Sequence, residues 1–136
     1  MSEVKRPPEK PRFRVGEKYD RPTIHERLGG GLQDFLPHVE GRVVCACLRS
    51  DTNPDAPTVI LPGTGSGIES SAWMLLGQAS PIPVFMKRCE NEWEYIGEYE
   101  VESFSRNRDA IAEQKKRSAR SDITMVIRMR EAKGEL

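Results

Sequence analysis

The strongest constraint on the fold is the alternation of side-chain types in residues 93–101. Trp93, Tyr95, Tyr99 and Val101 occupy odd positions of this stretch, whereas glutamates occupy even positions. Successive side chains of a β-strand point to opposite faces, so the pattern predicts a strand with one aromatic face and one acidic face. We expect this strand to form a hairpin with residues 84–87 across the turn at 90–92. Trp93 is expected to be buried against a helix formed by residues 68–78.

Other segments complete a mixed fold. Short apolar runs predict strands at 42–48, 58–61 and 123–129. Helices are predicted at 22–28, 68–78 and 107–120, because Pro22 suits a first helical turn and Asn107 suits an N-cap. This order of elements predicts a single small α+β domain with a curved mixed β-sheet and three short helices.

The length of 136 residues fits one domain. Residues 1–18 are rich in proline and basic side chains and nearly free of apolar ones, which is typical of a disordered or extended arm. We therefore expect the arm at 1–18, the folded domain at 19–130 and a tail at 131–136.

Cysteine use and hydropathy indicate the compartment. Cys45 and Cys47 are two residues apart in an apolar run, so both thiols face one side of a strand, and no second ligand pair completes a zinc site. We expect buried free thiols, no metal and no cofactor. No apolar stretch has the length of a membrane span, and none follows the basic residues near the N-terminus as a secretion signal requires. These features predict an intracellular protein, cytoplasmic or nuclear, with no membrane partner.

The charge is neutral overall but unevenly distributed. Residues 1–30 carry 8 basic and 5 acidic side chains, residues 31–103 carry 4 and 11, and residues 104–120 carry 6 and 2. Neutrality argues against strong non-specific nucleic-acid binding. Two alternatives remain for the basic segments. Either they are solvated surfaces, or folding brings them together as one positive, concave face complementary to a phosphate backbone.

The motifs of common enzymes are missing or incomplete. The stretch PGTGSG at 62–67 lacks the Lys-Ser/Thr that ends a P-loop, which favours a surface turn. No serine lies in a G-x-S-x-G elbow, and the two histidines have no evident catalytic partner. The sequence therefore predicts a protein that is not an enzyme. A small enzyme working through His25 and Cys45 remains as a weaker alternative.

One constellation suggests a ligand site. Arg21 and His25 share a helix face at i, i+4, and Gly30, Gly31 and Gln33 follow closely. A guanidinium fork, an imidazole, bare backbone amides and a carboxamide suit an anionic or heterocyclic ligand. The structural alternative is a capped helix whose arginine and histidine are satisfied internally.

These residues carry a resemblance to a known family. The matching stretches are Tyr19-x-Arg21-x-x-Ile24-His25, Gly30-Gly31-x-Gln33, Trp93-x-Tyr95-x-Gly97-Glu98-Tyr99 and Ala110-Ile111. In this order, over residues 19–129, the chain resembles the modified-DNA reader domains of McrA-type HNH restriction enzymes, including the sulfur-binding domains that recognise phosphorothioate DNA. The nuclease half has no counterpart here, so the resemblance implies recognition without cleavage.

We therefore expect a non-catalytic nucleic-acid-binding module, and more narrowly a reader of modified DNA, with DNA as its partner. The alternative is a protein–protein interaction or regulatory domain that docks a partner on a face made by Trp93, Tyr95 and Tyr99. The residues expected to form the binding surface are Arg21, His25, Gly30, Gly31, Gln33, Tyr95, Tyr99, Arg106, Lys115, Lys116 and Arg117.

Overall fold

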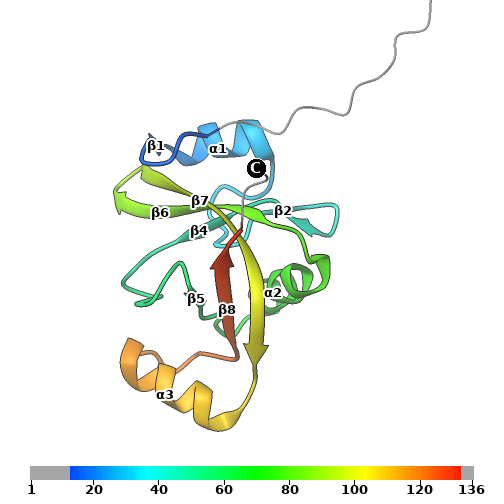
Figure 1. The fold of residues 1–136 in the computed structure, drawn as a ribbon, viewed down its shortest axis with the longest axis vertical. Helices are drawn as coiled ribbons and strands as arrows, with labels where there is room; N and C mark the ends of the chain where they lie inside the picture. Colours follow the sequence, from blue (N-terminus) through cyan, green and yellow to red (C-terminus); the bar gives the residue numbers. More distant parts are fainter. Residues whose placement is uncertain (1–12, 133–136) are drawn as a thin grey trace, which may run out of the picture.

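The computed structural model describes residues 13–132 of the chain. The elements follow one another as β1 (Lys18–Tyr19), α1 (Arg21–Leu28), β2 (His38–Val39), β3 (Arg42–Val43), β4 (Ala46–Leu48), β5 (Val59–Ile60), α2 (Ser66–Gln78), β6 (Ile82–Cys89), β7 (Glu92–Ser105), α3 (Arg108–Ser118) and β8 (Val126–Glu131). Figure 1 shows α1 at one end of the long axis and α3 at the other.

The main sheet has six strands in the order β4-β6-β7-β8-β5, and β1 pairs with β7 beside this path. β4 runs parallel to β6, and the other pairs are antiparallel. The sheet is therefore mixed, and with the three helices it confirms the expected small α+β domain.

The expected strand at 42–48 is instead two short strands. β3 pairs with β2 in a separate two-stranded sheet, whereas β4 lies at the end of the main sheet. The side chain of Gln78, at the end of α2, accepts from Val43 N at 2.8 Å and donates to Val43 O at 2.9 Å. This amide takes the place of a neighbouring strand, so α2 is joined directly to β3.

A β-bulge in β7 changes which face its side chains occupy. Tyr95 pairs with Phe85 and Gly97 pairs with Val84, so Ile96 is an additional residue between the two pairs. Gly97 has φ +120°, a conformation that side-chain-bearing residues rarely adopt. Consequently the odd positions before the bulge and those after it point to opposite faces of the sheet.

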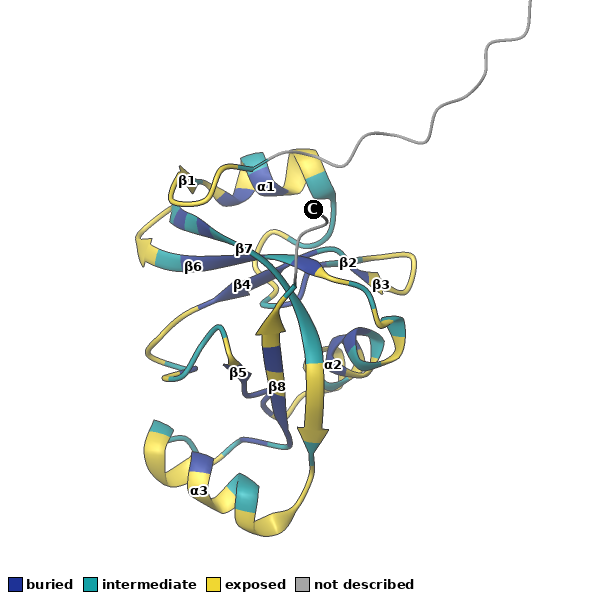
Figure 2. Cartoon of the chain, viewed as in Figure 1, coloured by how far each residue is buried: buried dark blue, intermediate teal, exposed yellow. Residues whose placement is uncertain are grey.

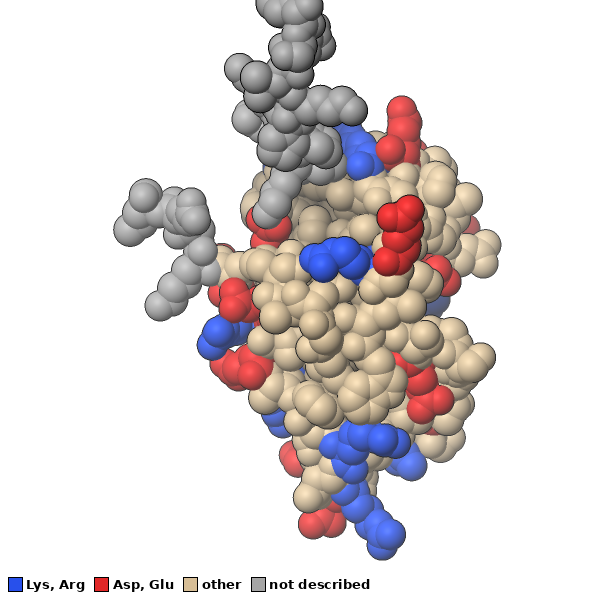
Figure 3. All heavy atoms as spheres, turned by 90° about the vertical axis from the view of Figure 1, so that its right-hand side faces the viewer, with Lys and Arg blue, Asp and Glu red and all other residues tan. Residues whose placement is uncertain are grey.

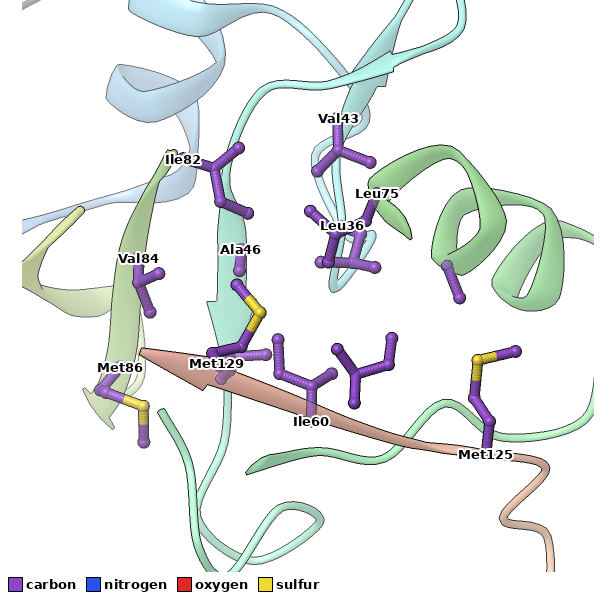
Figure 4. Close-up of a cluster of buried hydrophobic side chains, with 13 residues drawn as sticks. Leu36, Val43, Ala46, Ile60, Leu75, Ile82, Val84, Met86, Met125 and Met129 are labelled. Carbon is purple, nitrogen blue, oxygen red and sulfur yellow. The ribbon is translucent and has the colours of Figure 1, made fainter. Parts of the chain in front are cut away.

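Two hydrophobic clusters fill these two faces. The first contains Leu36, Val43, Ala46, Leu48, Ile60, Ala72, Leu75, Ile82, Val84, Met86, Met125, Ile127 and Met129. Figure 4 shows its side chains converging from β4, β6, β8 and α2. The second contains Ile24, Cys45, Cys47, Phe85, Trp93 and Tyr95. Figure 2 shows that burial is concentrated in the sheet, while α3 is mostly exposed.

The expectation of one aromatic face on β7 is therefore wrong in part. Trp93 and Tyr95 belong to the second cluster, whereas Tyr99 and Val101 pack at the edge of the first. Trp93 is buried as expected, but it packs with Ile24 of α1 rather than with α2. Alternation alone did not reveal the change, because it assumes an uninterrupted period of two.

Two side chains cap helix N-termini. Asn107 caps α3 as expected, accepting from Asp109 N at 2.8 Å, and Asp20, which was not singled out from the sequence, caps α1 by accepting from Thr23 N at 2.8 Å. Cys45 and Cys47 are buried free thiols on one face, as their spacing indicated. The neighbouring Cys47 and burial raise the pKa of the Cys45 thiol.

The described part of the expected N-terminal arm, residues 13–18, lies against the domain. The Phe13 ring packs edge-on against Phe85 and Tyr19, with centroid distances of 4.9 and 5.0 Å. Residues 1–12 of that arm and residues 133–136 of the tail lie outside the described residues. The sequence did not signal the role of Phe13, because one aromatic residue stands alone among charged and proline residues.

Candidate functional site

Arg21 lies inside the fold. Its side chain is 8% exposed, and Nη2 donates to Gly31 O and to Asp34 O, both at 2.9 Å. Its Cζ lies 5.2 Å from the centroid of the Trp93 ring. Two backbone carbonyls and an aromatic face thus compensate a buried cation. Arg21 holds the loop at residues 29–34 from within, as the structural alternative describes.

The glycines of this loop allow its backbone to lie close to neighbouring atoms. Gly30 has φ +84°, and a Cβ there would lie 2.6 Å from the Cβ of Pro37. A Cβ at Gly31 would collide with the carboxylate of Asp34. The exposed His25 places Nδ1 2.6 Å from Gly30 O. The constellation therefore builds a tight loop, and it presents Gln33 to solvent at the loop's tip.

That loop forms one wall of an open cleft of about 620 Å³. The other walls come from residues 52–53, the glycine-rich turn at 61–67, the start of α2 and residues 120–122. The lining residues are Gln33, Asp34, Phe35, His38, Thr52, Asn53, Leu61, Gly63, Gly65, Gly67, Ile68, Ser71, Arg120 and Asp122. Cavities of this size hold small-molecule-sized groups.

Arg120 fixes the base of the cleft. Its Nη1 donates to Thr52 O at 2.7 Å and to Leu61 O at 3.0 Å, while Nε and Nη2 donate to the two carboxylate oxygens of Asp122. These bonds hold the pKa of the Asp122 carboxyl below its ordinary value. One guanidinium thus ties together three segments that are distant in the sequence.

The neighbouring Asn53 completes this base. It is 5% exposed, and its Oδ1 accepts from Leu61 N at 2.8 Å. A Cβ at Gly63 would collide with the Asp122 carboxylate, so the glycine allows the turn to lie on the ion pair. The base of the cleft is therefore polar and rigid, and its polar side chains are hydrogen-bonded within the fold.

The rim of the cleft offers groups to a ligand. Asp34 supplies carboxylate oxygens, Gln33 supplies a carboxamide, and Phe35 supplies a half-buried ring. Gly65 is the N-cap of α2 and has no side chain to cap the helix, so first-turn amides and the positive end of the helix dipole lie at the cleft. Acceptors, donors and an aromatic surface at one opening suit a flat heterocycle with polar edges.

The two tyrosines expected in the binding surface lie elsewhere. Tyr95 is in the second hydrophobic cluster, and Tyr99 packs at the edge of the first. Neither lines the cleft. Because the bulge separates Tyr99 from Trp93 and Tyr95, the three rings do not form the single docking face that the interaction-domain alternative requires.

The described parts of the two basic segments do not meet. α1, which carries Arg21, and α3 lie at opposite ends of the molecule (Figure 1), so the expectation of one shared concave basic face is wrong. Figure 3 shows Lys and Arg side chains gathered at the lower end of one face, the end at which α3 lies. Sequence charge counts cannot show which segments become neighbours.

The basic last turn of α3 nevertheless borders the cleft. It contains Lys115, Lys116 and Arg117 and ends two residues before Arg120. Lys115 is close enough to contribute to the lowered pKa of Asp122. Arg117 pairs with Asp55 at 2.7 Å.

A further basic residue, Arg106, lies outside the cleft. Its Cζ is 5.8 Å from the centroid of the Trp73 ring. The expected residues thus fall into four groups: Gln33 in the cleft, the cations of α3 beside it, Arg106 over the Trp73 ring, and residues that build the fold.

The described residues contain no paired nucleophile and base. His25 and His38 each place Nδ1 against a backbone carbonyl, and the buried Cys45 contacts the sulfur of Cys47 at 4.0 Å. The weaker enzyme alternative, which needs His25 beside Cys45, therefore has no support from these contacts. In the same residues no three His, Cys, Asp or Glu side chains gather as a metal site would require, and no helix has the length and apolarity to cross a bilayer.

Sequence reasoning missed most of the cleft. Asp34, Asn53, Arg120 and Asp122 were not singled out, and the turn at 62–67 was interpreted only as a surface turn. The one signal was the repetition of glycine at every second position from Gly63 to residue 67, which permits close approach of another segment. Nothing in the sequence indicated which segment approaches.

Comparisons with known proteins show similarity at the level of family and fold. A family model described as "Domain of unknown function (DUF6697)" matches residues 18–133. No curated protein matches the chain significantly. Two crystal structures of the SUVH5 SRA domain have a similar fold. The complex with hemi-methylated CG DNA has a TM-score of 0.62 at 14% identity, and the complex with methylated CHH DNA has 0.57 at 15%. Each alignment covers 94% of both chains.

Proposed function

The chain belongs to the DUF6697 family, a domain of unknown function, and we propose that it is a non-catalytic reader of modified DNA that uses the cleft as its recognition site. The observation that carries this proposal is the polar cleft of about 620 Å³ with a rigid base beside a basic helix end. The fold supports it, since the SUVH5 SRA domain of the same fold is seen in complex with methylated DNA. A DNA partner places the protein inside the cell.

The cleft suits a base removed from the duplex stack. A protein that inspects a whole base takes it out of the helix and holds it by stacking and by hydrogen bonds to its edge. Phe35 offers the stacking surface, Asp34 accepts from an exocyclic amine, and Gln33 donates or accepts. The Arg120 network keeps these walls in place without using the groups at the rim.

The cations of α3 would supply attraction that is independent of sequence. Lys115 and Lys116 form no ion pair within the described residues and lie in the turn that leads to the cleft. Contacts between such lysines and phosphates release counterions, so affinity falls as salt rises. In this proposal α3 positions the DNA through its phosphates, and the cleft selects the base.

Fluorescence anisotropy with labelled duplexes tests the proposal. The duplexes are unmodified, hemi-methylated at cytosine, or phosphorothioate-linked, and the last tests the sequence resemblance to sulfur-binding domains. We expect salt-sensitive binding with a preference for one modified duplex. Asp34→Asn should reduce that preference, because a carboxylate acceptor becomes a donor-bearing amide. Glu90→Gln makes the same charge change at an exposed turn and should leave it intact.

Lys115→Ala with Lys116→Ala should weaken binding of all three duplexes alike. The slope of log affinity against log salt should fall by about 2, because each lysine that neutralises a phosphate adds close to one unit to that slope. If the wild type binds none of the duplexes in a salt-sensitive way, the proposal is refuted. Equal affinity for all three duplexes would refute the modification reader and leave only general DNA binding.

A further inference from the structure

An aromatic pair stands exposed beside α3, away from the cleft. Trp73 of α2 is 45% exposed and Phe104 of β7 is 47% exposed. Their rings meet edge-to-face, with centroids 5.8 Å apart and an interplanar angle of 82°. The two elements therefore hold the Trp73 ring in a defined orientation at the surface, rather than leaving a single mobile side chain there.

The cleft and this pair lie on different sides of α2. Ile68 and Ser71 line the cleft, whereas Trp73 is not among the lining residues. Five helical positions separate Ile68 from Trp73, which corresponds to about 140° around the helix axis. The aromatic pair is therefore a separate surface.

The exposed surface area of the aromatic pair indicates which class of partner it can bind. An aromatic side chain has about 150–250 Å² of surface, so the exposed parts of both rings, 45% and 47%, expose about 200 Å². A stable protein interface buries about 800 Å² on each partner. The pair is much smaller than such an interface, and its area matches contact with a single base.

The charges near the pair favour a nucleic acid. The Arg106 guanidinium lies over the Trp73 ring at 5.8 Å, and Arg106 forms no ion pair within the described residues. Arg108 follows at the start of α3, and basic side chains gather at this end of the face (Figure 3). Glu69, one helical turn before Trp73, is the acidic neighbour on α2. Single-strand-binding proteins combine an aromatic ring with flanking cations in this way.

We propose that Trp73, Phe104 and Arg106 form a second nucleic-acid site, at which an unstacked base of a single-stranded segment stacks on Trp73. Phe104 holds the ring edge-on, and the incoming base takes the place of the Arg106 guanidinium. Arg106 then lies beside the phosphate of that nucleotide. The site needs no modification of the base, since every base has a π-face.

Tryptophan fluorescence tests this site directly, because the chain has two tryptophans and the other, Trp93, is buried. Single-stranded oligothymidine is titrated into the full chain at low salt. We expect quenching of the wild type, and no quenching of Trp73→Phe, in which only Trp93 emits. Trp73→Leu should weaken single-strand binding by roughly 5- to 150-fold, the range for removal of one stacked base.

Two further variants complete the test. Val15→Ala removes apolar surface at a site 72% exposed and should bind like the wild type. Arg106→Gln should weaken binding and lower its salt dependence even if Trp73→Leu folds poorly. Duplex binding is measured in parallel, so a wild type that recognises duplexes but does not bind oligothymidine overturns this site alone.

Two other results would overturn the inference. One is oligothymidine binding of equal affinity in the wild type and Trp73→Leu. The other is a concentration-dependent dimer in sedimentation velocity that Trp73→Leu dissociates, since a second copy of the chain would then cover the ring.

Discussion

Replacing Arg21 by methionine should destabilise the fold, because the guanidinium acts inside it. Methionine retains similar volume but removes the two 2.9 Å hydrogen bonds to the carbonyls of Gly31 and Asp34 and the stacking on Trp93. A hydrogen bond from a charged donor contributes about 1.5–3 kcal/mol, and a partly desolvated cation–π contact about 1 kcal/mol. The buried cation carries a desolvation cost that its removal recovers in part. We expect the free energy of unfolding to fall by about 3 kcal/mol, within the range of these contributions after that recovery.

Urea unfolding followed by tryptophan fluorescence measures this change. Arg21→Lys should lie between methionine and the wild type, because an ammonium keeps the charge without the planar fork. Arg108→Met provides the control, since Arg108 is exposed and should change stability by less than about 0.5 kcal/mol. Amide exchange in residues 29–34 should accelerate in Arg21→Met.

The opposite result would restore the interpretation drawn from the sequence. If Arg21→Met costs less than about 1 kcal/mol, below the value of a single charged hydrogen bond, and instead abolishes binding of modified DNA, then Arg21 contacts the ligand and the internal role is refuted.

Three further predictions concern stability. Cys47→Ser should lower the free energy of unfolding, measured by thermal or chemical unfolding, by about 1–3 kcal/mol, because a hydroxyl replaces a buried thiol among apolar side chains. An unchanged melting temperature would contradict that burial. Gln78→Ala should lower the free energy of unfolding by about 2 kcal/mol, since it leaves a backbone N–H and a C=O of β3 without their partner. Gln78→Glu should restore only part of that free energy. Asp122 has a lowered pKa in the fold, so its contribution is present above the ordinary carboxyl pKa and is lost as the pH falls through the lowered value. The unfolding midpoint of Asp122→Asn should therefore fall less on acidification from about pH 6 to about pH 2.5 than that of the wild type, and parallel curves would show that its pairing with Arg120 has no role.

The elements of the fold were predictable because each depends on local patterns. Pro22, Asn107 and the alternation in residues 93–101 mark helix starts and a strand, and the structure contains all three. The strand at 42–48 was predicted as one element, because apolarity does not show that residues 44–45 leave one sheet for another.

The candidate site was far less predictable. Its walls come from residues 33–38, 52–53, 61–67 and 120–122, and long-range contacts bring them together. Arg21 and His25 were correctly placed near the glycine loop, but sequence spacing cannot tell whether a guanidinium points outward to a ligand or inward to backbone carbonyls. Burial decided that question for Arg21.

The additional residue at Ile96 has a consequence for how this family can vary. Residues before the bulge pack toward α1 and residues after it pack toward α2, so the two halves of β7 are held by separate cores. Deletion of Ile96 would remove the bulge and restore simple alternation with both halves of β7 on their present faces, because Tyr95 and Gly97 already pair with neighbouring residues of β6. A one-residue deletion at a distance from the bulge would instead move the side chains between the deletion and the bulge to the opposite face of the sheet. Relatives are therefore expected to carry one-residue gaps in β7 at the bulge more readily than in residues 92–94. An alignment of family members in which one-residue gaps are as frequent in residues 92–94 as at the bulge would contradict this constraint.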